Sequence, residues 1–308
     1  MNLPRRSGAA TLAAGPIRPA AVAGSFYPRD PESLRDLVLD DVRDAHFRHP
    51  APSSLRRPTG LLVPHAGLMY SGLVAASAWQ TLLEDARRPG PPTTVVLLGT
   101  NHAAVWLDGI GCWDAGAWRT PLGEVAVDDE LARAVVGLGQ PFGVDREAHT
   151  DEHSIEVQLP FLQVLAPGAA IVPLTVSAGV GPAARDAGDR LGALLAARRA
   201  AGARIVLVIS TDMAHYPPHR RAVVVTDALR PALLALDASA LAAQESSLRS
   251  QGLPGLMCGM CGIEPAVVGL AALRAMGAGY GIPLAAATSA EVGGPPERTV
   301  GYCAVAYP

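Results

Sequence analysis

The 308-residue chain contains no lysine, only four cysteines and few aromatic residues, which make up 5% of it. Its 25 basic residues are therefore all arginines, and we attach no function to that bias. Four cysteines in a chain of this length do not form the disulfide framework of a small secreted protein, so we predict a reducing, cytoplasmic setting. No apolar run approaches the ~18 residues of a membrane-spanning helix, which predicts that the chain has no membrane partner.

An excess of one charge is also missing. The formal net charge is −3 and the pI is near 6.2, which excludes the broad basic surface typical of nucleic-acid-binding proteins. Only 17% of the residues are charged, whereas 49% are hydrophobic. A chain with this composition can bury a sizeable core.

Short apolar runs alternate with helical patterns along the whole chain. Three runs rich in leucine and β-branched residues predict buried parallel strands: 60–63, 93–98 and 204–209. The pattern shows no internal repeat and no linker long enough to divide the chain. It predicts one three-layer α/β/α domain over residues 18–308, with a mostly parallel or mixed central sheet, after a disordered tail over residues 1–17.

A histidine follows each of these three runs within a short polar segment. The segments are Pro64-His65-Ala66-Gly67, Gly99-Thr100-Asn101-His102 and Ser210-Thr211-Asp212-Met213-Ala214-His215. In an open α/β sheet the ligand crevice lies outside the carboxyl ends of the strands, so we expect these histidines to converge there. One such histidine would more often serve a turn or a cap, but three together favour a shared metal or acid–base site.

The segment Cys258-Gly259-Met260-Cys261 has a spacing that also occurs in metal and redox sites. A four-cysteine zinc site would need a second pair, and Cys112 and Cys303 are isolated in strand-like sequence. We favour a functional role for Cys261 alone, because Gly262 and Pro265 place it at the entry to a helix. A helix start favours the thiolate, which is the form that binds metals.

The segment 151–156 is dense in titratable groups and begins a predicted helix over residues 152–165. Glu152 and His153 either belong to the site or form a solvated helix start whose acidic side chains interact favourably with the helix dipole. The sequence leaves both interpretations open. We expect His149 and His219 on the surface.

Several motifs occur in a characteristic order from about residue 17 to the C-terminus. They are Ala23-Gly24-Ser25-Phe26-Tyr27-Pro28, Pro64-His65-Ala66-Gly67 with Tyr70-Ser71-Gly72, Thr120-Pro121-Leu122-Gly123, Glu152-His153-Ser154-Ile155-Glu156 with Leu159-Pro160, and Cys261-Gly262 with Pro265. Together these motifs resemble the Memo family, whose prokaryotic branch is called AmmeMemoRadiSam system protein B. The resemblance implies a fold similar to the class III extradiol non-haem iron dioxygenases. It also implies that His65, His102 and Cys261 are metal ligands, with Asp212 and His215 close by.

The chain departs from these patterns in two places. The dioxygenases hold Fe(II) with two histidines and a carboxylate, whereas Cys261 stands where that carboxylate would be, so copper or zinc could compete with iron. The family's Ser-His-His is Asn101-His102-Ala103 here, so one histidine is lost. Glu264 lies three positions after Cys261 on the same helix face, and it either supplies the missing carboxylate or only interacts with the helix dipole.

The leading hypothesis is a metal-dependent oxygenase or redox enzyme with Fe(II) as the favoured ion and an unidentified small molecule or peptide as substrate. In this hypothesis His215 is the general base and Asp212 orients it, while four further residues surround the ligands: Tyr70, Glu152, His153 and Glu264. A non-catalytic protein that binds a metal or a peptide, and a metal-assisted hydrolase, are the alternatives. The family name also implies association with a radical-SAM protein.

Overall fold

The computed structural model describes residues 15–52, 55, 57–83 and 90–308. Residues 1–14 of the predicted N-terminal tail lie outside the described residues. Within the rest of the predicted tail, Ile17 pairs with Ala117 in the short strand β1 (Ile17–Arg18). The first regular element therefore begins just before residue 18.

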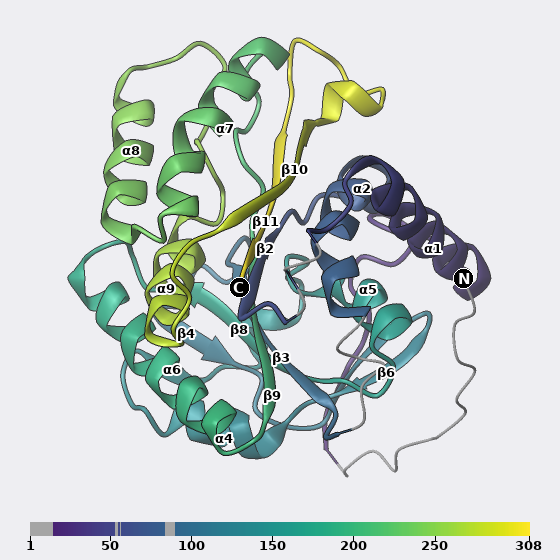
Figure 1. Ribbon diagram of the computed structural model, residues 1–308, viewed down its shortest axis with the longest axis vertical. Coiled ribbons are helices and arrows are strands. Elements are labelled where there is room, and N and C mark those ends of the chain that lie inside the picture. Colours follow the sequence, from purple (N-terminus) through teal and green to yellow (C-terminus); the bar gives the residue numbers. More distant parts are fainter. Residues whose placement is uncertain (1–14, 53–54, 56, 84–89) are drawn as a thin grey trace.

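Eight strands form one central mixed sheet in the order β10-β11-β2-β9-β3-β8-β4-β7 (Figure 1). The four central strands are mutually parallel: β2 (Gly60–Val63), β9 (Arg204–Ser210), β3 (Thr93–Thr100) and β8 (Ala170–Ser177). Antiparallel neighbours adjoin both sides of this group. On one side, β11 (Gly301–Tyr307) pairs with β2, and β10 (Ile282–Thr288) pairs with β11. On the other side, β4 (Gly109–Cys112) pairs with β8, and β7 (Phe142–Val144) pairs in parallel with β4. A separate small sheet joins β1 to β5 (Ala117–Thr120) and β6 (Gly123–Ala126).

Helices cover both faces of the central sheet, as Figure 1 shows. One layer contains α1 (Pro31–Arg48), α2 (Leu68–Trp79) and α5 (Leu159–Leu165). The other contains α6 (Pro182–Ala200), α7 (His219–Leu234), α8 (Ala238–Ser250) and α9 (Ile263–Ala275), while α4 (Asp129–Val136) packs near β7 and β8. Short 3-10 helices lie at Gln80–Leu82, Glu147–His149, Glu156–Gln158 and Ser289–Val292. The prediction of an α/β domain with a mixed central sheet is confirmed.

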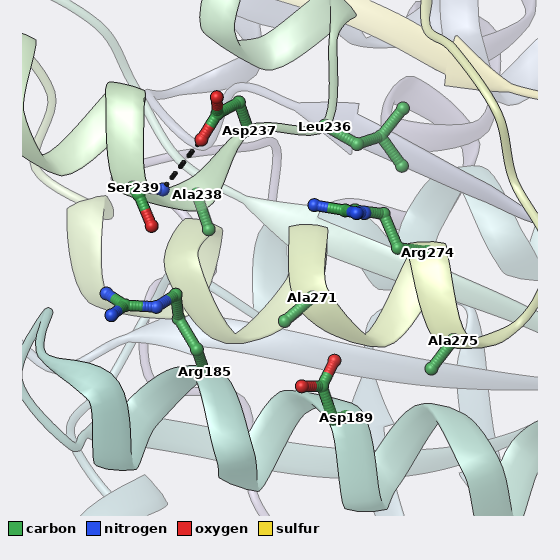
Figure 2. A pocket seen from close by; sticks show the side chains of 9 residues that line it. All are labelled: Arg185, Asp189, Leu236, Asp237, Ala238, Ser239, Ala271, Arg274 and Ala275. Atoms are coloured by element: carbon green, nitrogen blue, oxygen red, sulfur yellow. Dashed lines mark hydrogen bonds between the residues drawn. The ribbon is translucent and has the colours of Figure 1, made fainter.

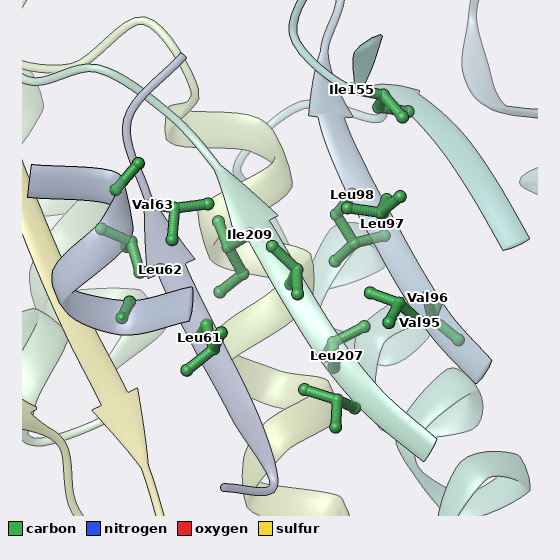
Figure 3. Packing of buried hydrophobic residues seen from close by; sticks show 14 of the residues in the cluster. Leu61, Leu62, Val63, Val95, Val96, Leu97, Leu98, Ile155, Leu207 and Ile209 are labelled. Carbon is green, nitrogen blue, oxygen red and sulfur yellow. The ribbon is translucent and has the colours of Figure 1, made fainter. Parts of the chain in front are cut away.

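The central strands are mostly apolar because helices cover both of their faces. Every residue of β2 and β3 is buried. Figure 3 shows side chains of Leu61, Leu207 and Leu97 on the three neighbouring strands β2, β9 and β3. This continuous core holds the carboxyl ends of the strands in fixed register.

The predicted helix over residues 152–165 begins later than expected. Residues 156–158 form a 3-10 turn, and the α-helix α5 starts at Leu159, with Pro160 in its first turn. Proline fits the first turn of a helix because its missing N–H would have no partner there. The residues before this turn are left in irregular conformation, and their main-chain groups bond to other parts of the molecule.

A close contact between α6 and α9 fixes the position of α9. A Cβ atom built on Gly188 or Gly192 would lie 2.3 Å from the carbonyl oxygen of Val268 or Ala272. Only glycine leaves room for helices that lie so near each other. Since α9 begins just after Cys261, this contact also helps to determine where that cysteine lies.

Asp41 of α1 is a half-buried side chain that faces α2, and its Oδ2 atom is buried. Its Oδ2 atom has no hydrogen-bond partner, and a Cβ built on Gly72 would lie 2.1 Å from it. Burial raises the pKa of Asp41 to about 7, and the neighbouring Asp44 and Asp40 add to the effect. The fold therefore favours the protonated form of this side chain.

Replacing Asp41 by asparagine should stabilise the protein at pH 8 but not at pH 4. In the unfolded chain the Asp41 carboxyl has its ordinary pKa. The protonated carboxyl therefore makes its full contribution to stability at pH values below that ordinary pKa, and the contribution is lost as the pH rises through about 7, the pKa in the folded protein. We expect the change in the free energy of unfolding caused by Asp41→Asn to be more favourable at pH 8 than at pH 4 by roughly 1–3 kcal/mol. Urea denaturation at both pH values measures this difference.

Asp36→Asn is the matched control, because Asp36 is exposed on the same helix and is not among the groups that raise the pKa of Asp41. We expect little change in its effect with pH. An Asp41→Asn effect that is the same at pH 4 and pH 8 would contradict the assignment of a raised pKa to Asp41.

Candidate metal centre

The loops that follow three neighbouring parallel strands meet at one edge of the central sheet. His65 follows β2, His102 follows β3, and Asp212 and His215 follow β9, the strand between them. Cys261 arrives from the turn before α9, where its main-chain N–H donates to the carbonyl oxygen of Asp212 at 3.2 Å. The structure thus brings together residues that are widely separated in the sequence.

His65, His102 and Cys261 form one of two groups of potential metal ligands among the described residues, and His102, Glu152 and His153 form the other. The first group combines residues from three separate loops. Each offers one ligand atom, and these atoms all lie within 4.8 Å of one another. The Nε2 atom of His65 lies 3.2 Å from the Sγ atom of Cys261, and the two histidine rings are 5.2 Å apart at a steep angle. Two imidazoles and a thiolate at this separation fit a transition-metal ion of the iron, copper or zinc type.

His65 is almost fully buried, and burial lowers its pKa well below the ordinary value. The nearby His153, His102 and His215 lower it further, because their positive charges would oppose a charge on His65. The Nδ1 atom of His65 lies 3.2 Å from Oγ of Ser210. The ring therefore stays neutral at physiological pH, and neutral imidazole is the form that binds a metal.

Cys261 is a protonated thiol when no metal is bound. Burial raises its pKa well above the ordinary value, and the Asp212 carboxylate raises it further. The main-chain N–H of Asp212 donates to Sγ at 3.3 Å, but this does not outweigh the burial. The expectation that the helix start favours the thiolate is wrong for the metal-free protein, because loss of hydration dominates.

Glu152 holds His102 through two hydrogen bonds. The main-chain N–H of His102 donates to Oε2 at 2.6 Å, and its Nδ1 lies 3.0 Å from Oε1. Oε1 also accepts the main-chain N–H groups of His153 and Ser154, both at 2.8 Å. Burial alone would raise the pKa of Glu152, but its contacts with His102, His153 and Ser154 lower it to about 2.

Because the Glu152 carboxylate is ionised and can only accept, Nδ1 of His102 carries a hydrogen, and Nε2 is the nitrogen that faces away from Glu152. A carboxylate behind a histidine is a frequent arrangement in metal sites. Of the two interpretations of the segment 151–156, the structure favours the one in which Glu152 belongs to the site.

His153 adds a third imidazole beside the ligand group. Its ring stacks on that of His102 with centroids 4.6 Å apart and lies 5.4 Å from that of His65. Phe26 contacts it at 4.6 Å, and burial lowers its pKa to about 4. His153 is therefore a neutral side chain next to the candidate ligands.

Asp212 and His215 are close to the group, but not in the relation predicted from the sequence. Oδ1 of Asp212 accepts the main-chain N–H groups of His65 and Ala66, at 2.7 and 3.2 Å. Nδ1 of His215 instead donates to the carbonyl oxygen of Met213 at 2.7 Å. The prediction that Asp212 orients His215 is thus wrong, because a neighbouring carbonyl does so while Asp212 holds the loop of His65.

Two other predicted site residues stand in different relations to the ligand group. Tyr70, in α2, is 41% exposed. Burial raises the pKa of Tyr302, and Asp212 and Tyr70 add to the effect, so Tyr70 lies near the side of the site that carries Asp212. Oε2 of Glu264 accepts the main-chain N–H of Gly179 at 2.9 Å. Glu264 therefore does not replace the missing carboxylate ligand.

Arg18 is a buried part of this region that the sequence analysis missed. Its Nε and Nη2 atoms donate to the carbonyl oxygens of His149 and Glu152, both at 2.6 Å, and its guanidinium pairs with Glu156. The ring of Trp118 covers the guanidinium at 4.1 Å. Glu156 could have indicated this contact in the sequence, because an acidic residue next to an apolar run needs a partner of opposite charge if it is buried.

Glu156 also forms hydrogen bonds with other residues of the N-terminal segment. Besides Arg18, it accepts the hydroxyl of Tyr27 and the main-chain N–H groups of Ala21 and Val22, at 2.8 and 3.0 Å. Residues 18–27 are thereby fixed against the segment that carries Glu152 and His153.

The expectation that His149 lies on the surface is wrong, because it is fully buried. Its Nε2 atom lies 2.9 Å from the carbonyl oxygen of Gly111, and its Nδ1 atom is 3.1 Å from Oγ1 of Thr175. Burial lowers its pKa to about 4. His219 is half-buried and bonds to Thr288 through Nδ1 at 2.9 Å.

Two hollows on the surface lie beside α9. One, of about 460 Å³, is lined by residues of α6, α9 and the start of α8, including Arg185, Asp189 and Arg274 (Figure 2). The side chain of Asp237 caps the first turn of α8 there. The other, of about 580 Å³, lies beside Arg249 and Glu264. Their lining does not include His65, His102 or Cys261.

Comparison with known proteins gives consistent matches over almost the whole chain. A family model described as Memo-like protein matches residues 18–306. A MEMO1 family protein of Methanopyrus kandleri is 36% identical over 299 residues, which cover 94% of this chain and 98% of that protein. A MEMO1 family protein of Methanothermobacter thermautotrophicus is 36% identical over 293 residues, which cover 93% and 98%.

A solved structure shows the same fold at low sequence identity. The crystal structure of an uncharacterized protein from Escherichia coli K12 superposes with a TM-score of 0.50 and 19% identity, covering 82% of this chain and 99% of that one. Within the part of the chain that the structure describes, no helix combines the length and apolar character needed to cross a membrane.

Glu156→Gln should strongly destabilise the protein, because it leaves the buried Arg18 guanidinium without a compensating charge. We expect the free energy of unfolding to fall by roughly 3 kcal/mol. Glu130→Gln, which breaks the exposed pair with Arg198, should cost less than about 1 kcal/mol. Urea denaturation at pH 7 compares the two variants, and equal losses would show that Arg18 does not depend on Glu156.

Proposed function

The chain belongs to the Memo family, and we propose that it binds one transition-metal ion through His65, His102 and Cys261 and acts as an oxygenase or related redox enzyme. The observation that carries the proposal is the grouping of these three ligand atoms within 4.8 Å. Both imidazoles have their Nδ1 atoms engaged by Ser210 and Glu152, so their Nε2 atoms remain for a metal.

Fe(II) is the ion that we favour, because the resemblance to the Memo family implies a fold similar to that of the non-haem iron dioxygenases. A three-ligand site leaves positions open for substrate, as in that class of enzyme. Bound iron would supply the ability to activate dioxygen. The Cys261 thiolate is softer than a carboxylate, so copper and zinc are the competing ions.

The other residues of the site hold the ligands and handle protons. Glu152 orients His102, and Asp212 fixes the loop that carries His65. We assign the role of general base to His215, because the Met213 carbonyl accepts from Nδ1 and leaves Nε2 able to take a proton from a substrate. His215 lies close enough to lower the pKa of His65 and of His153.

A metal-assisted hydrolase is the second candidate, favoured by the Cys261 thiolate because zinc accepts a histidine and cysteine ligand set. His215 would then take a proton from water. In either case the substrate is an unidentified small molecule or peptide. We also propose a cytoplasmic location, in keeping with the free cysteines of the described residues, and association with a radical-SAM protein.

Cys261→Ser should weaken metal binding far more than Cys258→Ser. The thiol of Cys261 lies 3.2 Å from His65, whereas Cys258 is outside the ligand group. We expect a loss of affinity of roughly 100-fold or more for the first variant and little change for the second. Anaerobic titration with Fe(II), and with Co(II) as a spectroscopic probe of sulfur ligation, measures both affinities.

The wild-type protein should bind one ion per chain in that experiment. Equal losses in the two variants would indicate that Cys258 and Cys261 act as a unit. Failure of the wild-type chain to bind Fe(II), Cu(II), Zn(II) or Co(II) would overturn the proposed function.

His215→Ala should leave the affinity for Fe(II) within a few-fold of the wild-type value but abolish turnover. The reason is that His215 is proposed to be a base and not a ligand. Metal content is compared with oxygen consumption in the presence of a panel of catechols. His46→Ala, which removes an exposed histidine of α1, is the control. Loss of the metal would make His215 a fourth ligand and would favour a closed, non-catalytic metal site.

A further inference from the structure

Behind His65, a chain of buried hydrogen bonds runs from Trp79 through Gln158 to Ser210. We infer that this chain fixes the tautomer of His65, with the hydrogen on Nδ1 and the lone pair on Nε2. Gln158 and Ser210 are then positioning residues for the metal centre, and this consequence rests on the proposed function. The tautomer itself follows from the donors and acceptors alone.

The first bond determines the orientation of the Gln158 amide. The indole Nε1–H of Trp79 can only donate, and it lies 2.9 Å from Oε1 of Gln158. The amide oxygen must therefore face Trp79. The amide nitrogen, with its two hydrogens, faces the other way.

The amide nitrogen of Gln158 uses both of its hydrogens. It donates to the carbonyl oxygen of Pro64 at 2.9 Å and to Oγ of Ser210 at 3.0 Å. The first acceptor belongs to the residue directly before His65. Gln158 thus holds the backbone of this loop as well as the hydroxyl of Ser210.

The Ser210 hydroxyl has one hydrogen and two lone pairs to distribute among three partners. The carbonyl oxygen of Ser154, at 2.6 Å, can only accept, so it takes the hydrogen. Gln158 donates to one lone pair. The partner of the other lone pair is Nδ1 of His65, at 3.2 Å, which must therefore be the donor.

Because these groups are buried, no other tautomer of His65 satisfies their hydrogen bonds. Trp79, Gln158, Ser210 and His65 are each at most 1% exposed, so water cannot substitute for a missing donor. The opposite tautomer would place two lone pairs face to face and leave buried polar atoms without partners. It would also direct an N–H toward the Cys261 sulfur and block the nitrogen that the metal needs.

The direct test is NMR of the metal-free protein with ¹⁵N-labelled histidine. Long-range ¹H–¹⁵N correlations distinguish a protonated ring nitrogen from an unprotonated one, and a His65→Asn sample assigns the signals. We expect His65 to carry its hydrogen on Nδ1. A wild-type His65 with its hydrogen on Nε2 would overturn the inference without any variant being needed.

Ser210→Ala removes the acceptor and should change both the tautomer and the metal affinity. We expect a mixture of His65 tautomers and an affinity for Co(II) that is lower by roughly 10–100-fold. Gln158→Met, a second variant of similar volume, frees the Ser210 hydroxyl to turn and should mix the tautomers with a smaller loss of affinity. Both measurements are made at a temperature where circular dichroism shows the variants to be folded.

Ser77→Ala is the matched control, because Ser77 is a fully buried serine of α2 that donates to the carbonyl oxygen of Val74 at 2.6 Å. It should leave the tautomer and the affinity unchanged. An unchanged tautomer and affinity in both Ser210→Ala and Gln158→Met would refute the positioning role. A wild-type protein with the Nδ1–H tautomer but no affinity for metals would reject the proposed function and leave the tautomer assignment standing.

Discussion

The buried pair between Arg18 and Glu156 is the interaction on which the site region depends. It joins the first strand of the chain to a segment 138 positions later in the sequence. Because Arg18 also binds the carbonyl oxygens of His149 and Glu152, it fixes the main chain on both sides of residue 150. This pair therefore positions the Glu152 carboxylate, and Glu152 in turn positions the ring of His102.

The residues of the candidate metal centre are therefore held from two directions. The parallel strands bring His65 and His102 to one sheet edge, and the segment before α5, which ends in a 3-10 turn, supplies the groups that orient them: Glu152, Ser154 and Gln158. Residues 150–155 of that segment do not form an α-helix, which leaves their carbonyl and amide groups available to other parts of the fold. The irregular conformation that the sequence analysis did not predict is thus what makes the site possible.

The sequence allowed the central strands and the convergence of the histidines to be predicted because both depend on local patterns. Continuous apolar runs indicate strands covered on both faces, and the ends of parallel strands must meet at one edge. The relations among Arg18, Glu156 and His149 could not be predicted, since they join residues far apart along the chain.

The orientation of His215 by the Met213 carbonyl could not be predicted for a different reason. It depends on how one turn of backbone is placed, and the residue types alone do not specify that. The protonated state of Cys261 likewise depends on how deeply the completed fold buries it, whereas the helix-start pattern indicated only a local effect.

The spacing of the three candidate ligands along the chain bears on when the protein can acquire its metal. Residues 65 and 102 leave the ribosome well before residue 261, and the last ligand is held in place only once α9 has packed against α6. A zinc finger folds around its ion, but here the ion would enter a domain whose core is already assembled. On the proposed function, metal binding would follow folding, and its rate would depend on access to the completed site and on the supply of metal.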